Sequence, residues 1–94
     1  MKHKSTPRNE QDIKNLKLRL NKISGQITGV TKMIDDNRYC KDILIQISAI
    51  ESALKEVAYL ILKEHLLTCV SDDVKNNNNT SLIESFDLAK KLWK

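Results

Sequence analysis

The chain has 94 residues, a formal net charge of +4, and only two glycines, one proline and one tryptophan. A chain of this length forms one small domain, whose core is too small to give much stability. We therefore expect the chain to oligomerise. The patterning excludes β-strands, which would need β-branched and aromatic residues between turn signals. No apolar run approaches a membrane span or a signal-peptide hydrophobic region, so we predict an all-α, cytoplasmic protein without a membrane partner.

The positive charge is concentrated at the N-terminal end of the chain. Residues 1–22 carry a net charge of +5, whereas the remaining residues carry a net charge of −1. This asymmetry is typical of a face that binds a polyanion. Charge alone fits equally well a solvated helix face preceded by a disordered basic tail. The basic residues of this segment are Lys2, Lys4, Arg8, Lys14, Lys17, Arg19 and Lys22.

Residues 1–8 are polar, so we predict a disordered basic tail here, followed by a single all-α domain over residues 9–94. Apolar residues over residues 13–34 alternate steps of three and four, the a/d pattern of a helix that packs lengthwise against other helices. Gly25 and Gly29 lie inside this pattern, which predicts the close approach of another backbone. Residues 35–37 predict a turn.

A second helix is expected to begin near Tyr39 or Cys40. Its apolar residues again alternate steps of four and three over residues 43–61, and a second apolar stripe includes Leu44 and Leu62. A helix that is apolar on two sides is central and is covered by neighbours on both. Neither Gly nor Pro occurs in residues 40–74, so we predict one continuous helix of about eight turns or more.

The C-terminal segment predicts a connector and a short third helix. Residues 75–79 are rich in Asn, which favours turns. Ser81 and Glu84 have capping-box spacing, with Ser81 as the N-cap. A short amphipathic helix would then pack through Leu82, Phe86, Ala89 and Trp93. No helix-turn-helix spacing occurs.

Cys40, His65 and Cys69 are the most informative residues of the chain. His65 and Cys69 are four residues apart and therefore project from one helix face, one turn apart. Cys40 lies about 44 Å from Cys69 along a continuous helix. The three side chains can act together only if Cys40 meets the His and Cys of a second, antiparallel copy. Small residues near the helix midpoint would allow that crossing: Ser48, Ala49, Ser52 and Ala53.

Two thiolates and one imidazole form a soft ligand set, which selects Cu(I), Zn(II) or iron–sulfur clusters. Zinc usually takes a fourth ligand, for which a helix–helix interface leaves little room, so three-coordinate Cu(I) fits best. Taken singly, Cys40 also fits a small core hydrophobe, and His65 a surface residue at a helix end. A catalytic Cys69–His65 pair is a further alternative, but no orienting acid, oxyanion hole or substrate pocket accompanies it. We therefore expect neither an enzyme nor a small-molecule substrate.

Four segments of the chain resemble the motifs of one known family. They are residues 19–26 (RLNKISGQ), Tyr39-Cys40 followed by Asp42, residues 46–49 (QISA) and residues 65–69 (HLLTC). All four are similar to motifs of the copper-sensing operon repressor (CsoR) family. The resemblance covers nearly the whole chain after the N-terminal tail.

The resemblance implies a three-helix protomer, an antiparallel four-helix-bundle dimer and a dimer of dimers, that is, a homotetramer. Members of the family bind operator DNA and release it when an inducer binds. In their copper sensors, Cu(I) is held by residues that match Cys40 of one subunit and His65 and Cys69 of another. Tyr39 matches a residue that supports these ligands. Members that sense nickel, cobalt, formaldehyde or persulfide do not have this Cys-His-Cys pattern.

The chain departs from the family pattern at two positions. Ser85, with Glu84 beside it, stands where the copper sensors often have a Glu that supports the ligands. Glu56, with Lys55 beside it, stands where an Arg implicated in DNA binding is common, whereas Arg19 is retained. The first departure concerns the inducer and its coupling, and the second concerns the extent of the DNA-binding face.

These observations favour a Cu(I)-responsive repressor that binds operator DNA when it is metal-free. We expect the phosphate contacts to come from Lys14, Lys17, Arg19 and Lys22, with Lys55 adjoining them. One alternative is a persulfide-sensing repressor of the same fold that uses Cys40 and Cys69 of neighbouring chains. Another is a cytosolic copper-buffering or thiol-redox protein that does not bind DNA.

Overall fold

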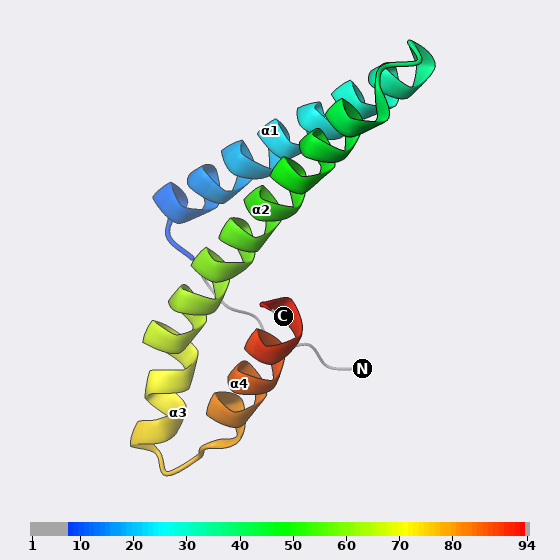
Figure 1. Ribbon diagram of the computed structural model, residues 1–94. Helices are drawn as coiled ribbons and strands as arrows, with labels where there is room; N and C mark the ends of the chain where they lie inside the picture. The colour runs from blue at the N-terminus through cyan, green and yellow to red at the C-terminus, as the bar shows by residue number, and fades with distance from the viewer. Residues whose placement is uncertain (1–7, 94) are drawn as a thin grey trace, which may run out of the picture. The chain divides into compact units, whose positions relative to one another are not determined.

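The computed structural model describes residues 8–93, and every regular element in that part of the chain is helical. The order is α1 (Glu10–Asp35), α2 (Cys40–His65), the π-helical turn η1 (Leu66–Val70), α3 (Ser71–Lys75) and α4 (Thr80–Leu92) (Figure 1). The predicted all-α class is confirmed, and the three predicted helices correspond to α1, α2 and α4. The predicted tail lies outside the described residues except for Arg8.

The chain divides into two compact units. The first, Asn9–Val57, contains α1 and the first part of α2. The second contains Arg8 and the chain from Ala58 onward, with the end of α2, η1, α3 and α4. The prediction of a single domain over residues 9–94 is not tested by this division and stays a prediction. None of the helices in the described part of the chain is both long and apolar enough to span a membrane.

Helix α1 has the boundaries that its sequence predicts. The Asn9 side chain accepts a hydrogen bond from the backbone N–H of Asp12 at 2.8 Å, which satisfies one of the unpaired donors of the first turn. Glu10 and Asp12 in that turn also complement the positive end of the helix dipole. The helix ends at the predicted turn, where Asn37 takes a φ of 53°, a left-handed conformation that Asn tolerates.

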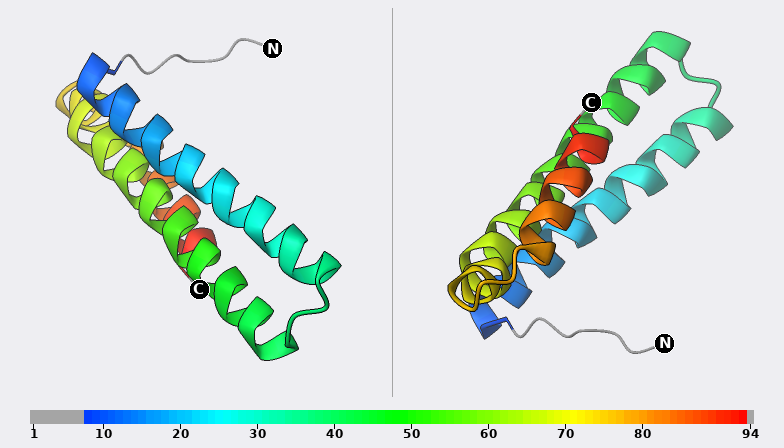
Figure 2. Two further views of the ribbon diagram at one scale, coloured as in Figure 1. Left: turned by 90° about the horizontal axis from the view of Figure 1, so that it is seen from above. Right: turned by 90° about the horizontal axis from the view of Figure 1, so that it is seen from below.

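The hairpin of α1 and α2 is held by one apolar core. Ile23 and Val30 of α1 and Ile50 and Val57 of α2 are buried, and Leu16, Ile43 and Ala53 pack against them. The buried residues recur every seven positions on each helix, as the a/d pattern predicts. The two helices consequently lie side by side and antiparallel through this unit (Figure 2).

A second set of apolar residues in the hairpin remains exposed. We call it the exposed stripe, and its members also recur every seven positions on each helix. On α2 they are Ile47 and Leu54, and on α1 they are Ile13, Leu20, Ile27 and Ile34, with exposed fractions of 37–58%. A monomer gains nothing by presenting such a stripe to water, so the stripe is suited to packing against another chain.

The expected close approach of a backbone at Gly25 and Gly29 does not occur within the chain. A Cβ built at either glycine would meet no heavy atom within 4 Å. Both glycines therefore face open space, and neither is required by packing between α1 and α2.

The helix predicted over residues 40–74 is continuous, but its turn type changes at one place. Helix α2 ends at His65, and the next five residues form the π-helical turn η1 before α3 resumes α-helical geometry. The Thr68 hydroxyl donates a hydrogen bond of 2.8 Å to the carbonyl of Glu64, a contact that often bends helices. Such π turns are rare and are frequently found at functional sites.

The predicted N-cap of the last helix is also wrong. Helix α4 begins at Thr80, whose backbone N–H bonds the Asn78 side chain at 3.1 Å, so Ser81 lies inside the helix. The Ser81 hydroxyl donates to Asp73 Oδ2 at 2.7 Å, and the buried Ser85 hydroxyl donates to the Ser81 carbonyl at 2.8 Å. A tertiary partner on α3 has replaced the local capping interaction.

The face on which α4 packs differs from the predicted one. Its buried residues are Ser81 and Ser85, which have exposed fractions of 5% and 3%. Of the predicted apolar set, Leu82 and Ala89 are half-buried, whereas Phe86 is 68% exposed and Trp93 is 38% exposed. Serine side chains are small enough to let α4 lie close to η1 and α3, whereas the large aromatic side chains of Phe86 and Trp93 are exposed.

Candidate metal centre and nucleic-acid interface

Cys40 is the first residue of α2, and its thiol is exposed. It precedes Ile47 and Leu54 by seven and fourteen positions, so it lies on the exposed stripe of α2. The interpretation of Cys40 as a core hydrophobe therefore does not hold within one chain. Tyr39 comes directly before the helix and is 70% exposed. A thiol in this position is available to a second chain that covers the stripe.

His65 and Cys69 lie where α2 gives way to η1. His65 is the last residue of α2, Cys69 belongs to η1, and both are half-buried. The Thr68 hydroxyl lies 3.7 Å from Cys69 Sγ. Because η1 is a π turn, the backbone between these two candidate ligands departs from the regular α-helical geometry that their sequence separation predicts.

Glu64, which precedes His65 in the sequence, makes two side-chain or backbone contacts. Its carboxylate forms an ion pair with Arg8, with 3.2 Å between Arg8 Nε and Glu64 Oε2, and both side chains are partly buried. Its carbonyl accepts the Thr68 hydroxyl. Sequence patterns did not point to the ion pair, because the partners are far apart along the chain. The Thr68 contact had a signal, since Thr can bond the carbonyl four residues earlier.

One chain does not bring the three candidate ligands together. Helix α2 itself separates Cys40 at its first residue from His65 at its last. Between Arg8 and Trp93, no three His, Cys, Asp or Glu side chains gather into a group that could hold a metal ion. The site shared between two chains stays a prediction that rests on spacing and on the exposed stripe.

Ser85 and Glu84 differ sharply in their surroundings. Ser85 is 3% exposed and its hydroxyl donates to a backbone carbonyl of its own helix, whereas Glu84 is exposed. The Ser85 proton is therefore committed to α4, and only the oxygen's acceptor capacity remains. Whether Ser85, Glu84 or Tyr39 supports the ligands stays a prediction.

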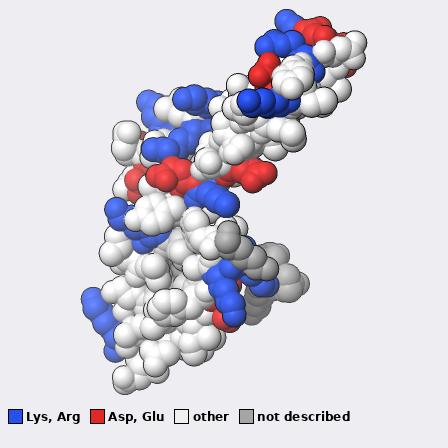
Figure 3. Space-filling model, viewed as in Figure 1, with Lys and Arg blue, Asp and Glu red and all other residues white. Residues whose placement is uncertain are grey.

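The residues expected to bind DNA are all exposed and all lie in the hairpin. Figure 3 shows basic atoms, with acidic atoms among them, over α1 and around the α1–α2 turn. Arg19 and Lys22 line a groove between α1 and α2 with a volume of about 420 Å³, together with Asn15, Gln26 and Glu56. The Arg19 guanidinium also donates to the Asn15 side chain at 3.4 Å. The remaining candidates, which do not line this groove, are Lys14, Lys17 and Lys55.

Comparison with known proteins identifies the family. Residues 12–92 match the model of the family described as metal-sensitive transcriptional repressors. The chain belongs to this family. It is 41% identical over 95 residues to the copper-sensing transcriptional repressor CsoR of Bacillus subtilis (strain 168), an alignment that covers 100% of this chain and 90% of that protein. The resemblance seen in the sequence motifs is thereby confirmed.

Solved structures of the family share the fold. The Cu(I)-containing copper-sensing repressor CsoR of Geobacillus thermodenitrificans NG80-2 superimposes with a TM-score of 0.86 at 43% identity, over 96% of this chain and 95% of that chain. The nickel-responsive transcriptional regulator InrS superimposes with a TM-score of 0.72 at 33% identity, over 96% and 99% of the two chains. One backbone fold is therefore shared by a Cu(I)-containing repressor and a nickel-responsive regulator.

Proposed function

We propose that this chain is a Cu(I)-responsive transcriptional repressor that binds operator DNA when metal-free and releases it when Cu(I) binds. The observation that carries the proposal is the position of Cys40, an exposed thiol at the head of an uncovered apolar stripe. The relatives named above as copper-sensing repressors support the same conclusion, and none of them is named as an enzyme. We expect the protein to act in the cytoplasm.

The exposed stripe supports an antiparallel dimer. Packing the stripes of two hairpins together would bury the exposed Ile and Leu side chains of α1 and α2, each with a gain of about 1–2 kcal/mol for the part removed from water. The same packing would bring Cys40 of one chain toward His65 and Cys69 of the partner subunit. Association of two such dimers into a homotetramer is the finer part of the proposal and rests on the family resemblance.

The donor set fits Cu(I) by its chemistry. Cys40 and Cys69 supply thiolates and His65 supplies an imidazole nitrogen, and soft sulfur ligands select Cu(I) over harder ions. When bound, Cu(I) would supply the free energy that favours the form of the repressor with a closed site. The residues of the chain supply the donors: Cys40 is the first residue of α2, His65 is its last, and Cys69 lies in η1.

The DNA-binding part of the proposal rests on the basic face of α1. Lys14, Lys17, Arg19 and Lys22 are exposed on one helix, and Lys55 lies on the neighbouring one. Cationic side chains at phosphates dominate the affinity of such contacts and make it fall with salt. Coupling between two sites is reciprocal, so operator DNA should weaken Cu(I) binding by the same factor by which Cu(I) weakens DNA binding.

A persulfide-responsive repressor of the same fold is the second candidate. The exposed thiol of Cys40 favours it, because an exposed thiol is open to sulfur chemistry as well as to metal binding. The two candidates differ in their need for His65. A copper sensor requires the imidazole as a ligand, whereas a sensor that works through Cys40 and Cys69 does not.

The decisive experiment is an anaerobic Cu(I) titration of the full chain bound to a labelled duplex from the promoter of its own gene, followed by fluorescence anisotropy. We expect Cu(I) to release the wild-type protein and to leave the Cys40→Ala variant bound. Cys40 is exposed, so the variant should fold and bind metal-free DNA like the wild type. DNA affinity that is insensitive to Cu(I) in the wild type would overturn the proposal.

A further inference from the structure

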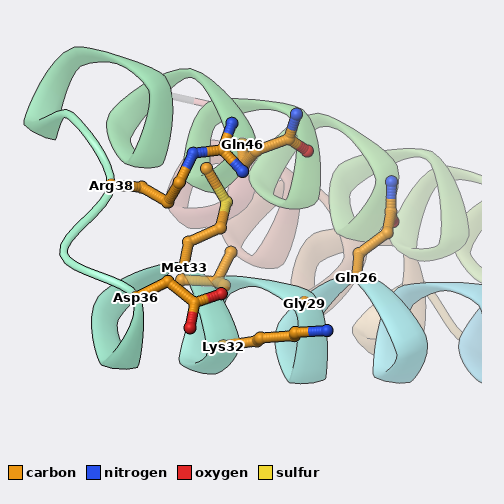
Figure 4. Close-up of a pocket in the computed structure, with 8 residues that line it drawn as sticks. Gln26, Gly29, Lys32, Met33, Asp36, Arg38 and Gln46 are labelled. Carbon is orange, nitrogen blue, oxygen red and sulfur yellow. The ribbon is translucent and has the colours of Figure 1, made fainter.

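The α1–α2 hairpin contains a second groove, at the end where the two helices are joined. It has a volume of about 440 Å³ (Figure 4). Lys32 lines it from α1, Gln46 from α2, and Asp36 and Arg38 from the segment between the helices. No candidate ligand of the metal centre lines it. A polar groove with two cations requires an explanation other than core packing.

The two grooves of the hairpin adjoin on one face of α1. Gln26 lines both of them. Six of the nine α1 residues that line the two grooves follow steps of three and four, which keep side chains on one helix face: Asn15, Arg19, Lys22, Gln26, Gly29 and Met33. The groove that contains the proposed DNA contacts Arg19 and Lys22 therefore continues toward Lys32 and Arg38.

The chemistry of this continuous face fits a sugar–phosphate backbone. Four cations, Arg19, Lys22, Lys32 and Arg38, outnumber the two carboxylates, Glu56 and Asp36. Amide side chains lie between them, and amides together with Lys and Arg make most of the contacts to DNA phosphates and sugars. The core of an interface between protein chains would instead be apolar and depleted in charged side chains, Lys in particular.

Two further features of the groove favour the close approach of a ligand. Gln26 Oε1 is buried and has no hydrogen-bond partner. Gly29 lines the groove, and a Cβ at that position would meet nothing in the chain, so backbone is laid bare to the open space. A buried acceptor without a partner carries a desolvation penalty, which a water molecule that donates to it can relieve.

We propose that the DNA-binding surface extends along the whole hairpin, and that Lys32 and Arg38 bind the phosphate backbone in the groove bordered by Gly29. This extension rests on the proposed function and lengthens its DNA contact. The strand would follow the face of α1 from Asn15 to the α1–α2 turn. Lys32 and Arg38 thus join Arg19 and Lys22 as residues that set affinity and salt dependence without reading bases.

The first test removes both charges with Lys32→Gln and Arg38→Gln together. Each phosphate contact contributes about 0.9 to the slope of log K against log salt, so the slope should become shallower by about 1.8 for each chain that contacts the DNA, and affinity at moderate salt should fall at least about tenfold. The probe is the labelled promoter duplex with the metal-free full chain. The matched control is Lys41→Gln with Lys75→Gln, which changes the net charge equally at exposed positions outside both grooves.

The second test fills the groove without changing charge. Gly29→Ala should fold at least as stably as the wild type, because Ala favours helix over Gly and the new Cβ meets nothing in the chain. It should nevertheless weaken DNA binding, since the methyl group stands where the strand would approach. The thermal unfolding midpoint and the anisotropy titration are measured on the same sample.

The outcomes separate this inference from the proposed function. A slope that stays unchanged in the Lys32/Arg38 variant, or that changes equally in the Lys41/Lys75 control, overturns the extension while leaving the repressor intact. An altered molecular mass of the variant in sedimentation would make the groove an interface between copies, which also overturns it. Absence of DNA binding or Cu(I) release in the wild type would instead overturn the proposed function itself.

Discussion

The two units of the chain solve their packing in different ways. In the hairpin, Asn9–Val57, regular helices bury branched apolar residues at heptad spacing. In the unit from Ala58 onward, a π turn, a five-residue helix and two buried serines, with Val70 as the one buried apolar residue among those described, take the place of that pattern. The hairpin carries Cys40 and the DNA-binding candidates, whereas the other unit carries His65 and Cys69. The candidate metal ligands are thus divided between the regular unit and the irregular one.

The largest expected effect is a loss of stability in the hairpin core. Ile50→Ala should lower the free energy of unfolding by about 2–5 kcal/mol, because Ile50 is 8% exposed and packs among Ile23, Val30 and Val57. Phe86→Ala in the other unit should cost less than about 1 kcal/mol, since that ring is 68% exposed. Urea unfolding at one fixed protein concentration compares the two variants. Equal losses would mean that the Phe86 face is covered in the assembled protein.

The next effect concerns coupling and not stability. His65→Ala should remove the release of DNA by Cu(I), a coupling of about 1–3 kcal/mol in systems of this kind, while metal-free DNA affinity stays near that of the wild type. The measurement is an anaerobic anisotropy titration with Cu(I) and, separately, with a persulfide donor. A variant that still responds to Cu(I) would contradict the copper assignment, and one that responds only to the persulfide donor would favour the alternative sensor.

A smaller effect should appear in the contact that docks α4. Asp73→Ala leaves the buried Ser81 hydroxyl without its acceptor and should cost about 1–2 kcal/mol. Asp72→Ala is the matched control, because Asp72 is an exposed neighbour on the same short helix. Hydrogen exchange should show faster opening of α4 with the hairpin unaffected. Equal exchange in both variants would mean that the Asp73–Ser81 bond does not hold the helix.

The smallest expected effect is a gain. Glu56 shares a groove with Arg19 and Lys22, so its carboxylate opposes phosphate binding there. Glu56→Gln should tighten metal-free DNA binding about threefold at low salt, with a smaller difference at high salt as the charges are screened. Glu51→Gln provides the control, because it makes the same charge change on α2 outside the groove. An equal gain in DNA affinity in both variants would mean that Glu56 acts only through the net charge of the protein.

The sequence predicted the hairpin well for a physical reason. Heptad spacing in α1 and α2 depends on local periodicity, and the ends of α1 depend on Asn9 and on the turn at residues 35–37, which act locally. The geometry of the other unit could not be predicted, because it depends on contacts with residues that are not sequence neighbours. Ser81 fits a capping box, but α4 already begins at Thr80, and the Ser81 hydroxyl donates to the Asp73 carboxylate on another helix. The π turn at η1 adds one residue to a single helical turn, and this hardly changes the spacing of the apolar residues in the sequence.

The candidate site was predictable in its residues but not in its geometry. The sequence spacing predicted that Cys40 lies far from His65 and Cys69 within one chain. In the structure, Cys40 is the first residue of α2 and His65 is the last. Spacing could not anticipate that Cys69 lies in a π turn or that Glu64 beside His65 pairs with Arg8. The ion pair joins residues that are far apart in the sequence, so no local pattern could indicate it. The role of each site residue stays a prediction until variants are measured.

The placement of Cys40 and His65 at the two ends of α2 has a genetic consequence. If each site takes its ligands from opposite ends of two chains, an allele damaged at Cys40 and an allele damaged at His65 are not equivalent losses. A cell that expresses both would assemble some mixed dimers, in which one site inherits both defects and the other inherits none. Two inactive alleles could then restore a copper response that neither supports alone, and two alleles damaged at the same end could not.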